Sequence, residues 1–175
     1  MKIILLILVV IFITSCTSAE KTINRYNKKD FELEKYLGKW YEIVRKDNNF
    51  EKNLINVTAE YSLKKNGDIQ VKNSGFNEVK SENNSVIGKA KVKYGESKNI
   101  LKVSFFGPFY GDYIIMEIDK DYKYALVRSS NEKFLWILSR ESQLDLVIVE
   151  KLLQKAELDG ITIENLIYVK QEKRD

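Results

Sequence analysis

The chain of 175 residues contains no histidine, a single cysteine and a single proline. Without histidine, both the commonest general base and the commonest metal ligand are missing. One cysteine can form neither an internal disulfide nor a cysteine-cluster metal site. Nucleophile–base pairs of the Ser-His and Cys-His kind are therefore excluded. We expect no metal, no cofactor and no catalytic residue, although paired carboxylates would still be available to an enzyme.

The sequence also lacks a block of charge of one sign. Its 29 Lys and Arg residues and 25 Asp and Glu residues are mixed along the chain, and the net charge is +4. A nucleic-acid-binding domain normally carries a basic patch or stripe, so we expect no nucleic-acid partner. With 44% apolar and 31% charged residues, the composition favours one folded domain over disorder.

The longest apolar run lies at the N-terminus, from Ile3 to Ile13. It is too short to span a bilayer, which takes about 20 residues, and is typical of a signal-peptide core. The following Ile13-Thr14-Ser15-Cys16 resembles the bacterial lipobox. This resemblance implies cleavage before Cys16 and acylation of that cysteine, the lipidation site. An ordinary secreted protein with a free thiol is the alternative.

The lipobox divides the N-terminal region into a signal peptide, 1–15, and a lipidated N-terminus and tether, 16–35. Thr17, rather than aspartate, follows the cysteine. By resemblance to enterobacterial sorting, this favours a lipid anchor in the outer membrane, with the leaflet left open.

The body of the chain alternates apolar and polar residues with period two, which indicates half-buried strands. Asn66-Gly67, between two such runs, is a strong hairpin signal. We predict an all-β fold, an eight-stranded antiparallel up-and-down barrel that leaves no exposed edges. The expected strands cover 38–47, 56–64, 68–76, 85–94, 99–106, 112–119, 122–129 and 133–140.

The period changes after Arg140 to helical spacing, with Ser142 as the N-cap candidate and Asp145 in the third position after it. Gly160 is the expected stop. We predict a C-terminal α-helix packed outside the barrel; a helix that binds a partner or a membrane is the alternative. The remaining expected segments are the helix at 142–158, a short final strand at 165–170 and a polar tail at 171–175.

Three short motifs resemble those of the lipocalin family. Gly38-Lys39-Trp40 matches the first motif, Asp121-Tyr122 matches part of the second, with Lys120 in place of threonine, and Arg140 matches the third. The stretches "LGKWYEIVRK" and "VSFFGPFYGDY" are similar to bacterial lipocalins of the outer-membrane lipoprotein type. The resemblance covers 36–170 and implies that Trp40 plugs the closed end of the barrel beneath Arg140. Gly38, Trp40, Asp121, Tyr122 and Arg140 are accordingly expected to be structural.

Ligand contacts must come from inward-facing residues. If Trp40 and Arg140 face inward, Leu135 and Ile137 face out, where the helix can cover them. Among the carboxylates, Glu42 and Glu117 are expected to point in. A solid core is the alternative to a cavity. The predicted ligand-binding residues are Ala59, Tyr61, Val71, Asn73, Val86, Gly88, Val103, Phe105, Tyr113, Ile115, Phe134 and Trp136.

An apolar lining suits an acyl chain whose polar end lies at the mouth. Each buried methylene contributes about 0.8 kcal/mol, which offsets the cost of association without a charge pair. We therefore predict a membrane-anchored protein that stores or carries fatty acids or lysophospholipids in the cell envelope. A structural or protein-binding envelope lipoprotein and an enzyme acting on a lipid are the alternatives. Whether the protein forms a homodimer is left open.

Overall fold

The computed structural model describes residues 28, 30–93, 98–131 and 133–172. The predicted signal peptide, Cys16 and most of the predicted tether lie outside these residues. Across the described ranges, no helix is long and apolar enough to cross a membrane.

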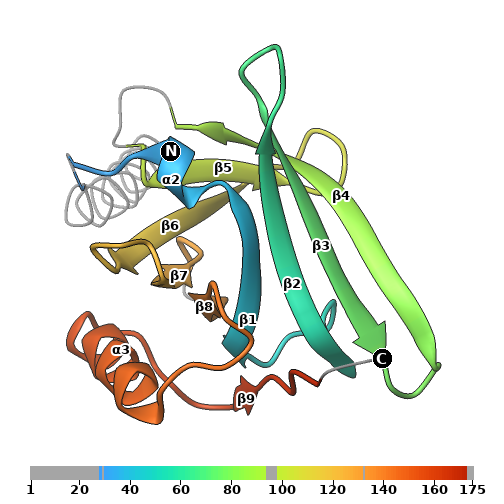
Figure 1. The fold of residues 1–175 in the computed structure, drawn as a ribbon, viewed down its shortest axis with the longest axis vertical. Helices are drawn as coiled ribbons and strands as arrows, with labels where there is room; N and C mark the ends of the chain where they lie inside the picture. Colours follow the sequence, from blue (N-terminus) through green and yellow to red (C-terminus); the bar gives the residue numbers. More distant parts are fainter. Residues whose placement is uncertain (1–27, 29, 94–97, 132, 173–175) are drawn as a thin grey trace, which may run out of the picture.

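Eight antiparallel strands form a closed barrel (Figure 1). Each strand pairs with the next, and β1 pairs with both β2 and β8, which closes the sheet. The predicted fold class and strand order are therefore confirmed. The strands are β1 (Gly38–Lys46), β2 (Leu54–Leu63), β3 (Ile69–Asn77), β4 (Glu82–Val92), β5 (Ile100–Ser104), β6 (Gly111–Ile118), β7 (Tyr124–Arg128) and β8 (Leu135–Ser139).

The up-and-down order gives the barrel two different ends. The short helix α2 (Leu33–Tyr36) lies where β1 begins, and we call this the closed end (Figure 1). The opposite end, which we call the mouth, is where β1 ends and β2 begins. The loops at the mouth are 47–53, 78–81, 105–110 and 129–134.

Helix α3 (Leu146–Leu158) packs outside the barrel beside β7 and β8 (Figure 1). Leu135 and Ile137 share one apolar cluster with its buried face, as expected. Its predicted start is wrong: Asp145, rather than Ser142, is the N-cap. The Asp145 carboxylate accepts a hydrogen bond of 2.8 Å from the Val147 amide, and a negative charge is favourable at a helix N-terminus.

The C-terminal segment completes the wall of the barrel. β1 and β2 pair only over the first part of β1, from Gly38 to Tyr41. Strand β9 (Leu166–Tyr168) pairs with the last part of β1 instead. Beyond it, the Gln171 side-chain amide donates 2.9 Å hydrogen bonds to the carbonyls of Glu42 and Val57. Gln171, predicted to belong to a polar tail, is thus part of the fold.

Residues 31–35, predicted as the end of the tether, are also part of the fold. Phe31, Leu33 and Tyr36 are buried and join the apolar cluster inside the barrel. The Trp40 indole N–H donates a 2.8 Å hydrogen bond to the Tyr36 carbonyl. The segment stays on the barrel because its apolar side chains cover the closed end, so the tether must end before Phe31.

Two β-bulges decide which charged side chains face inward. A bulge adds one residue to a strand and so reverses the alternation beyond it. In β1 the bulge lies between Glu42 and Val44, which puts both Glu42 and Arg45 on the inner face. In β6 it lies between Ile115 and Glu117. The prediction that Glu117 points inward is therefore wrong.

Candidate functional site in the barrel interior

The closed end is held by Arg140 over Trp40. The guanidinium carbon lies 3.8 Å from the centroid of the indole, a cation–π distance. Its N–H groups also donate to the carbonyls of Lys35, Leu37 and Lys39 at 2.7–2.9 Å. Gly38 has a φ of +93°, and a side chain there would meet Arg140 at 3.4 Å. A glycine therefore lets the chain turn into the barrel beside this contact.

The Asp121-Tyr122 motif also has a place at the closed end. Tyr122 is buried, its hydroxyl accepts a 2.7 Å hydrogen bond from the Glu32 amide, and its carbonyl accepts one from Arg140 at 3.3 Å. Asp121 is exposed. The carboxylate that orders this turn belongs to Asp119, which accepts from the amides of Asp121 and Lys123. Sequence reasoning missed Asp119.

The half of the interior nearest the closed end is densely filled. Of the predicted lining residues, Tyr61, Val71 and Ile115 are buried there. The hydroxyl of Tyr113 lies 2.7 Å from that of Tyr61 and 2.6 Å from that of Tyr36. Burial is the main cause that raises the pKa of each of these three tyrosines well above its ordinary value. They are therefore neutral hydroxyls at the floor of the interior.

The half nearest the mouth is less filled. Inward-facing side chains there keep accessible surface, so they border space that is not occupied by protein. These residues are Asn73, Val103, Phe105, Tyr113 and Trp136. Ala59 also keeps accessible surface, but it pairs with Trp40 near the closed end. The side-chain oxygen Oδ1 of Asn73 is buried without a hydrogen-bond partner, and such an atom is costly unless a ligand or water satisfies it.

Two predicted lining residues on β4 differ from this pattern. β5 pairs only with Lys89 to Val92 of β4. Val86 lies before this paired part and is 37% exposed. Gly88 is buried beneath Phe105, whose ring carbon would lie 2.7 Å from an added Cβ. Gly88 therefore makes room for an aromatic side chain and offers a ligand little surface of its own.

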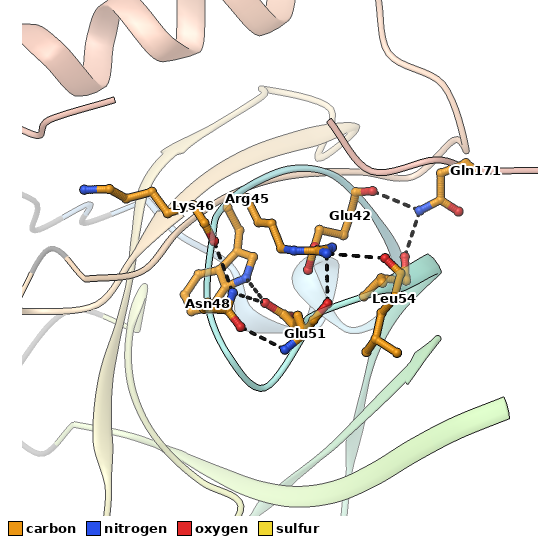
Figure 2. A network of polar contacts seen from close by, with 9 residues as sticks. Glu42, Arg45, Lys46, Asn48, Glu51, Leu54 and Gln171 are labelled. Atoms are coloured by element: carbon orange, nitrogen blue, oxygen red, sulfur yellow. Dashed lines mark hydrogen bonds and ion pairs between the residues drawn. The ribbon is translucent and has the colours of Figure 1, made fainter. Parts of the chain in front are cut away.

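A polar cluster lies at the mouth, made of the buried Glu42, Arg45 and Glu51 and the half-buried Asn48; we call it the mouth cluster (Figure 2). Arg45 Nη1 donates to Glu42 Oε1 at 2.9 Å, and both side chains are at least 95% buried. Arg45 Nη2 donates to the Glu51 carbonyl at 2.9 Å and to the Leu54 carbonyl at 3.3 Å. These bonds fold the 47–53 loop onto the barrel wall.

A row of aromatic rings adjoins the mouth cluster. Trp136 lies beside Tyr113, with ring centroids 6.4 Å apart, and stacks on Phe134 at 5.7 Å. Phe134 in turn meets Phe50 of the 47–53 loop at 5.2 Å. The Trp136 indole N–H donates to Glu51 Oε2 at 3.3 Å. The two residues predicted from β8, Phe134 and Trp136, thus lie at the mouth, as ligand contacts would require.

The mouth cluster has more carboxyl groups than cations. Burial, and then the negative charge of Glu51, raise the pKa of Glu42 well above its ordinary value, against the opposing effect of Arg45. Sequence reasoning placed Glu42 inward but missed Arg45, Asn48 and Glu51. Simple alternation from Trp40 would place Arg45 on the outer face of β1. The bulge between Glu42 and Val44 turns it inward, and the sequence gives no signal of that bulge.

The geometry agrees with comparisons to known proteins. Residues 31–171 match the family model described as a lipocalin-like domain. The chain belongs to this lipocalin family. It is 41% identical to the outer membrane lipoprotein Blc of Vibrio cholerae, over 98% of this chain and all of the relative. It is 39% identical to the protein of the same name in Escherichia coli K12, over 81% of this chain and 80% of that one.

Solved structures resemble this lipocalin in fold alone. Insecticyanin from the tobacco hornworm has a TM-score of 0.67 at 18% identity, over 85% of each chain. The cockroach allergen Per a 4 has a TM-score of 0.66 at 19% identity, over 82% of this chain and 90% of that one. Identities this low carry no conclusion about ligands.

Proposed function

We propose that this lipocalin binds single-chain lipids, fatty acids or lysophospholipids, with the acyl chain inside the barrel. One observation carries the proposal: inward-facing apolar and aromatic side chains in the mouth half retain accessible surface. Burial of each methylene there contributes about 0.8 kcal/mol. The predicted lining residues include no nucleophile–base pair. The contact of Arg140 with Trp40 closes one end of the barrel and is not a reactive centre. We therefore propose binding and not catalysis.

We also propose that the protein is anchored to the outer membrane through acylated Cys16. The Ile13-Thr14-Ser15-Cys16 sequence supports this, and so do relatives named as outer membrane lipoproteins. Lys28 already contacts Asn99 and Glu117 of the barrel, so roughly a dozen residues link the anchor to the barrel. A tether of this length leaves the mouth free to meet a membrane lipid. A homodimer is consistent with the proposal and is not required by it.

Tryptophan emission tests the binding proposal, because the two tryptophans lie in different halves of the barrel. Trp136 borders the accessible space, whereas Trp40 is fully buried under Arg140. A lysophospholipid added to the protein body without its first 27 residues should change the emission. Trp136→Phe should remove most of this change and Trp40→Phe should retain it. A protein whose emission and native mass ignore every lipid would contradict the proposal.

A further inference from the structure

Lysine side chains gather on the outer face of the barrel wall where β4 pairs with β5. Lys91 of β4 lies directly opposite Lys102 of β5, and like charges in that position destabilise a sheet. The ammonium groups of Lys89 and Lys91 lie over one ring, that of Tyr110, at 5.5 Å and 4.9 Å from its centroid. A carboxylate oxygen of Asp112 lies 2.6 Å from the Lys102 ammonium. Cations still outnumber carboxylates in this described group, so an anion from outside the protein would relieve their repulsion.

The same lysines border an open pocket on the outside of the barrel. Its volume is about 340 Å³, and its lining is Lys91, Val92, Lys93, Lys102 and Tyr110. The volume exceeds that of a phosphate group, and the lysines supply the complementary charge. Ala90, which alternates with the lysines on β4, belongs to the apolar cluster inside the barrel. The pocket is therefore separated from the interior by the wall itself.

The loop between β5 and β6 presents two aromatic rings to solvent beside this pocket. Phe106 and Phe109 are 75% and 80% exposed, and Tyr110 of the same loop lines the pocket. The buried Ser104 hydroxyl donates a 3.1 Å hydrogen bond to the Gly107 carbonyl, and Gly107 has a φ of +60°, which favours glycine. The turn thus holds both rings outward. Aromatic rings beside lysines are typical of surfaces that enter the interface of a bilayer.

The opposite side of the barrel has the opposite charge. Helix α3 packs beside β7 and β8, and β4 lies across the barrel from β8 (Figure 1). Residues 141–164, which include α3, contain six Asp and Glu residues and two Lys residues. An anionic surface therefore attracts the β4–β5 wall and repels the side of α3, which favours one orientation of the barrel.

The N-terminal segment meets the fold beside the same wall. The Lys28 amide donates a 3.2 Å hydrogen bond to Asn99 Oδ1, and Asn99 directly precedes β5. Lys28 comes 12 positions after Cys16, and a fully extended chain of that length spans about 40 Å. A lipid anchor at Cys16 therefore permits the barrel to lie with this wall against the bilayer that holds it.

From these observations we propose that the outer face of β4 and β5, with the loop between β5 and β6, docks on an anionic phospholipid bilayer. Phosphate groups of the bilayer surface lie in the pocket at Lys91 and Lys102, and Phe106 and Phe109 lie among the headgroups. This goes beyond the proposed binding of a lipid inside the barrel, because it uses other side chains and a different surface. Docking is weak by itself, since it rests on a few lysines and two rings, and it orients a barrel that the acyl anchor retains.

Sedimentation with lipid vesicles tests the proposal, using the chain from Thr17 onward, which has no acyl anchor. Vesicles that contain phosphatidylglycerol should bind the protein at least about tenfold more tightly than vesicles of phosphatidylcholine alone. Added salt should weaken this binding, because it screens exposed charges. Equal binding to both kinds of vesicle, or no binding to the anionic vesicles at low salt, would overturn the proposal.

Paired lysine variants locate the contact. Lys89→Gln combined with Lys91→Gln should weaken binding to the anionic vesicles by about tenfold or more. Lys123→Gln combined with Lys151→Gln is the matched control, because it removes the same charge from exposed positions on the side of β7 and α3. The control pair should retain the binding. Equal losses for the two pairs would show that net charge alone is responsible and would overturn the docking surface.

The aromatic rings are tested separately. Phe106→Ser combined with Phe109→Ser should weaken binding to the anionic vesicles by about tenfold, because burial of the rings in the interface is lost. Wild-type binding by this variant would overturn the role of the loop.

The response of Trp136 emission to a lysophospholipid distinguishes this proposal from lipid binding inside the barrel. It should be unchanged in the Lys89 and Lys91 variant, whose substitutions lie outside the barrel. If docking fails and the response remains, the docking surface is overturned and the proposed function stands. If docking occurs and the wild-type protein shows no response, docking is supported and the proposed lipid binding is wrong.

Discussion

Arg140 and Trp40, 100 positions apart in the chain by their numbers, meet at 3.8 Å at the closed end of the barrel. The same guanidinium binds carbonyls on both sides of Gly38, at Leu37 and Lys39. One side chain therefore ties β8 to the start of β1 and covers the indole beneath it. The contact stabilises the closed end, far from the mouth where we place the ligand's polar group.

Arg140→Ala should lower the free energy of unfolding by about 2–4 kcal/mol, the range for a broken buried polar network. Several carbonyls at the closed end would lose their donor, and Trp40 would be uncovered. Urea unfolding measures the loss. Arg140→Lys is the companion variant, which keeps the positive charge but not the several N–H donors of the guanidinium. Its free energy of unfolding should lie between those of wild type and Arg140→Ala. An unfolding curve for Arg140→Ala that coincides with wild type would show that the contact contributes nothing.

Gly88→Ala should destabilise the barrel by about 1–3 kcal/mol, the cost of overpacking a filled site. Its Cβ would lie 2.7 Å from Phe105 Cδ1 and from the Ser104 carbonyl, so backbone as well as side chain must move. Displacement of Phe105 into the accessible half should also weaken lipid binding. Gly111→Ala is the matched control, because nothing lies within 4 Å of its added Cβ. Equal melting temperatures for Gly88→Ala and Gly111→Ala would contradict the crowding at Gly88.

The stability of the lipid-free body should fall as the pH rises through the raised pKa of Glu42. A carboxyl whose folded pKa lies above its unfolded value stabilises the fold by binding a proton. That contribution is complete below the ordinary pKa of 4.5 and is lost through the raised pKa. Glu42→Gln should flatten this part of the profile, whereas Glu117→Gln should leave it unchanged. Denaturant unfolding at a series of pH values, from about pH 5 to about pH 9, measures it; identical profiles for Glu42→Gln and wild type would refute it.

Cys16→Ala should abolish membrane attachment and leave the barrel folded. Acyl chains on this cysteine make the anchor in our proposal, and the residue lies outside the described fold. Fractionation of cells that express the variant, with circular dichroism of the soluble product, provides the measurement. If the variant stays tightly bound to membranes, another surface, such as the exposed Phe106 and Phe109 at the mouth, anchors the protein.

Local patterning determined most of the architecture. Period-two alternation, the Asn66-Gly67 turn and the change to helical spacing after Arg140 are properties of neighbouring residues, so they predict strands, hairpins and the helix without tertiary information. The spacing of Gly38 and Trp40 carried the resemblance to a known family. The burial of Val71 and Ile115 inside the barrel also agrees with simple alternation, since no bulge lies between those positions and the turns that begin their strands.

The mouth cluster, in contrast, was decided by tertiary structure. Glu42 and Arg45 share the inner face only because a bulge adds one residue between them, and a bulge is set by how β1 must pair with β8 on one side and β9 on the other. Glu51 is buried only because the 47–53 loop folds back onto Arg45 and Trp136. An exposed loop and a buried one can have the same polar sequence. What separates them is whether distant donors satisfy the polar groups, and that is settled only when the barrel closes.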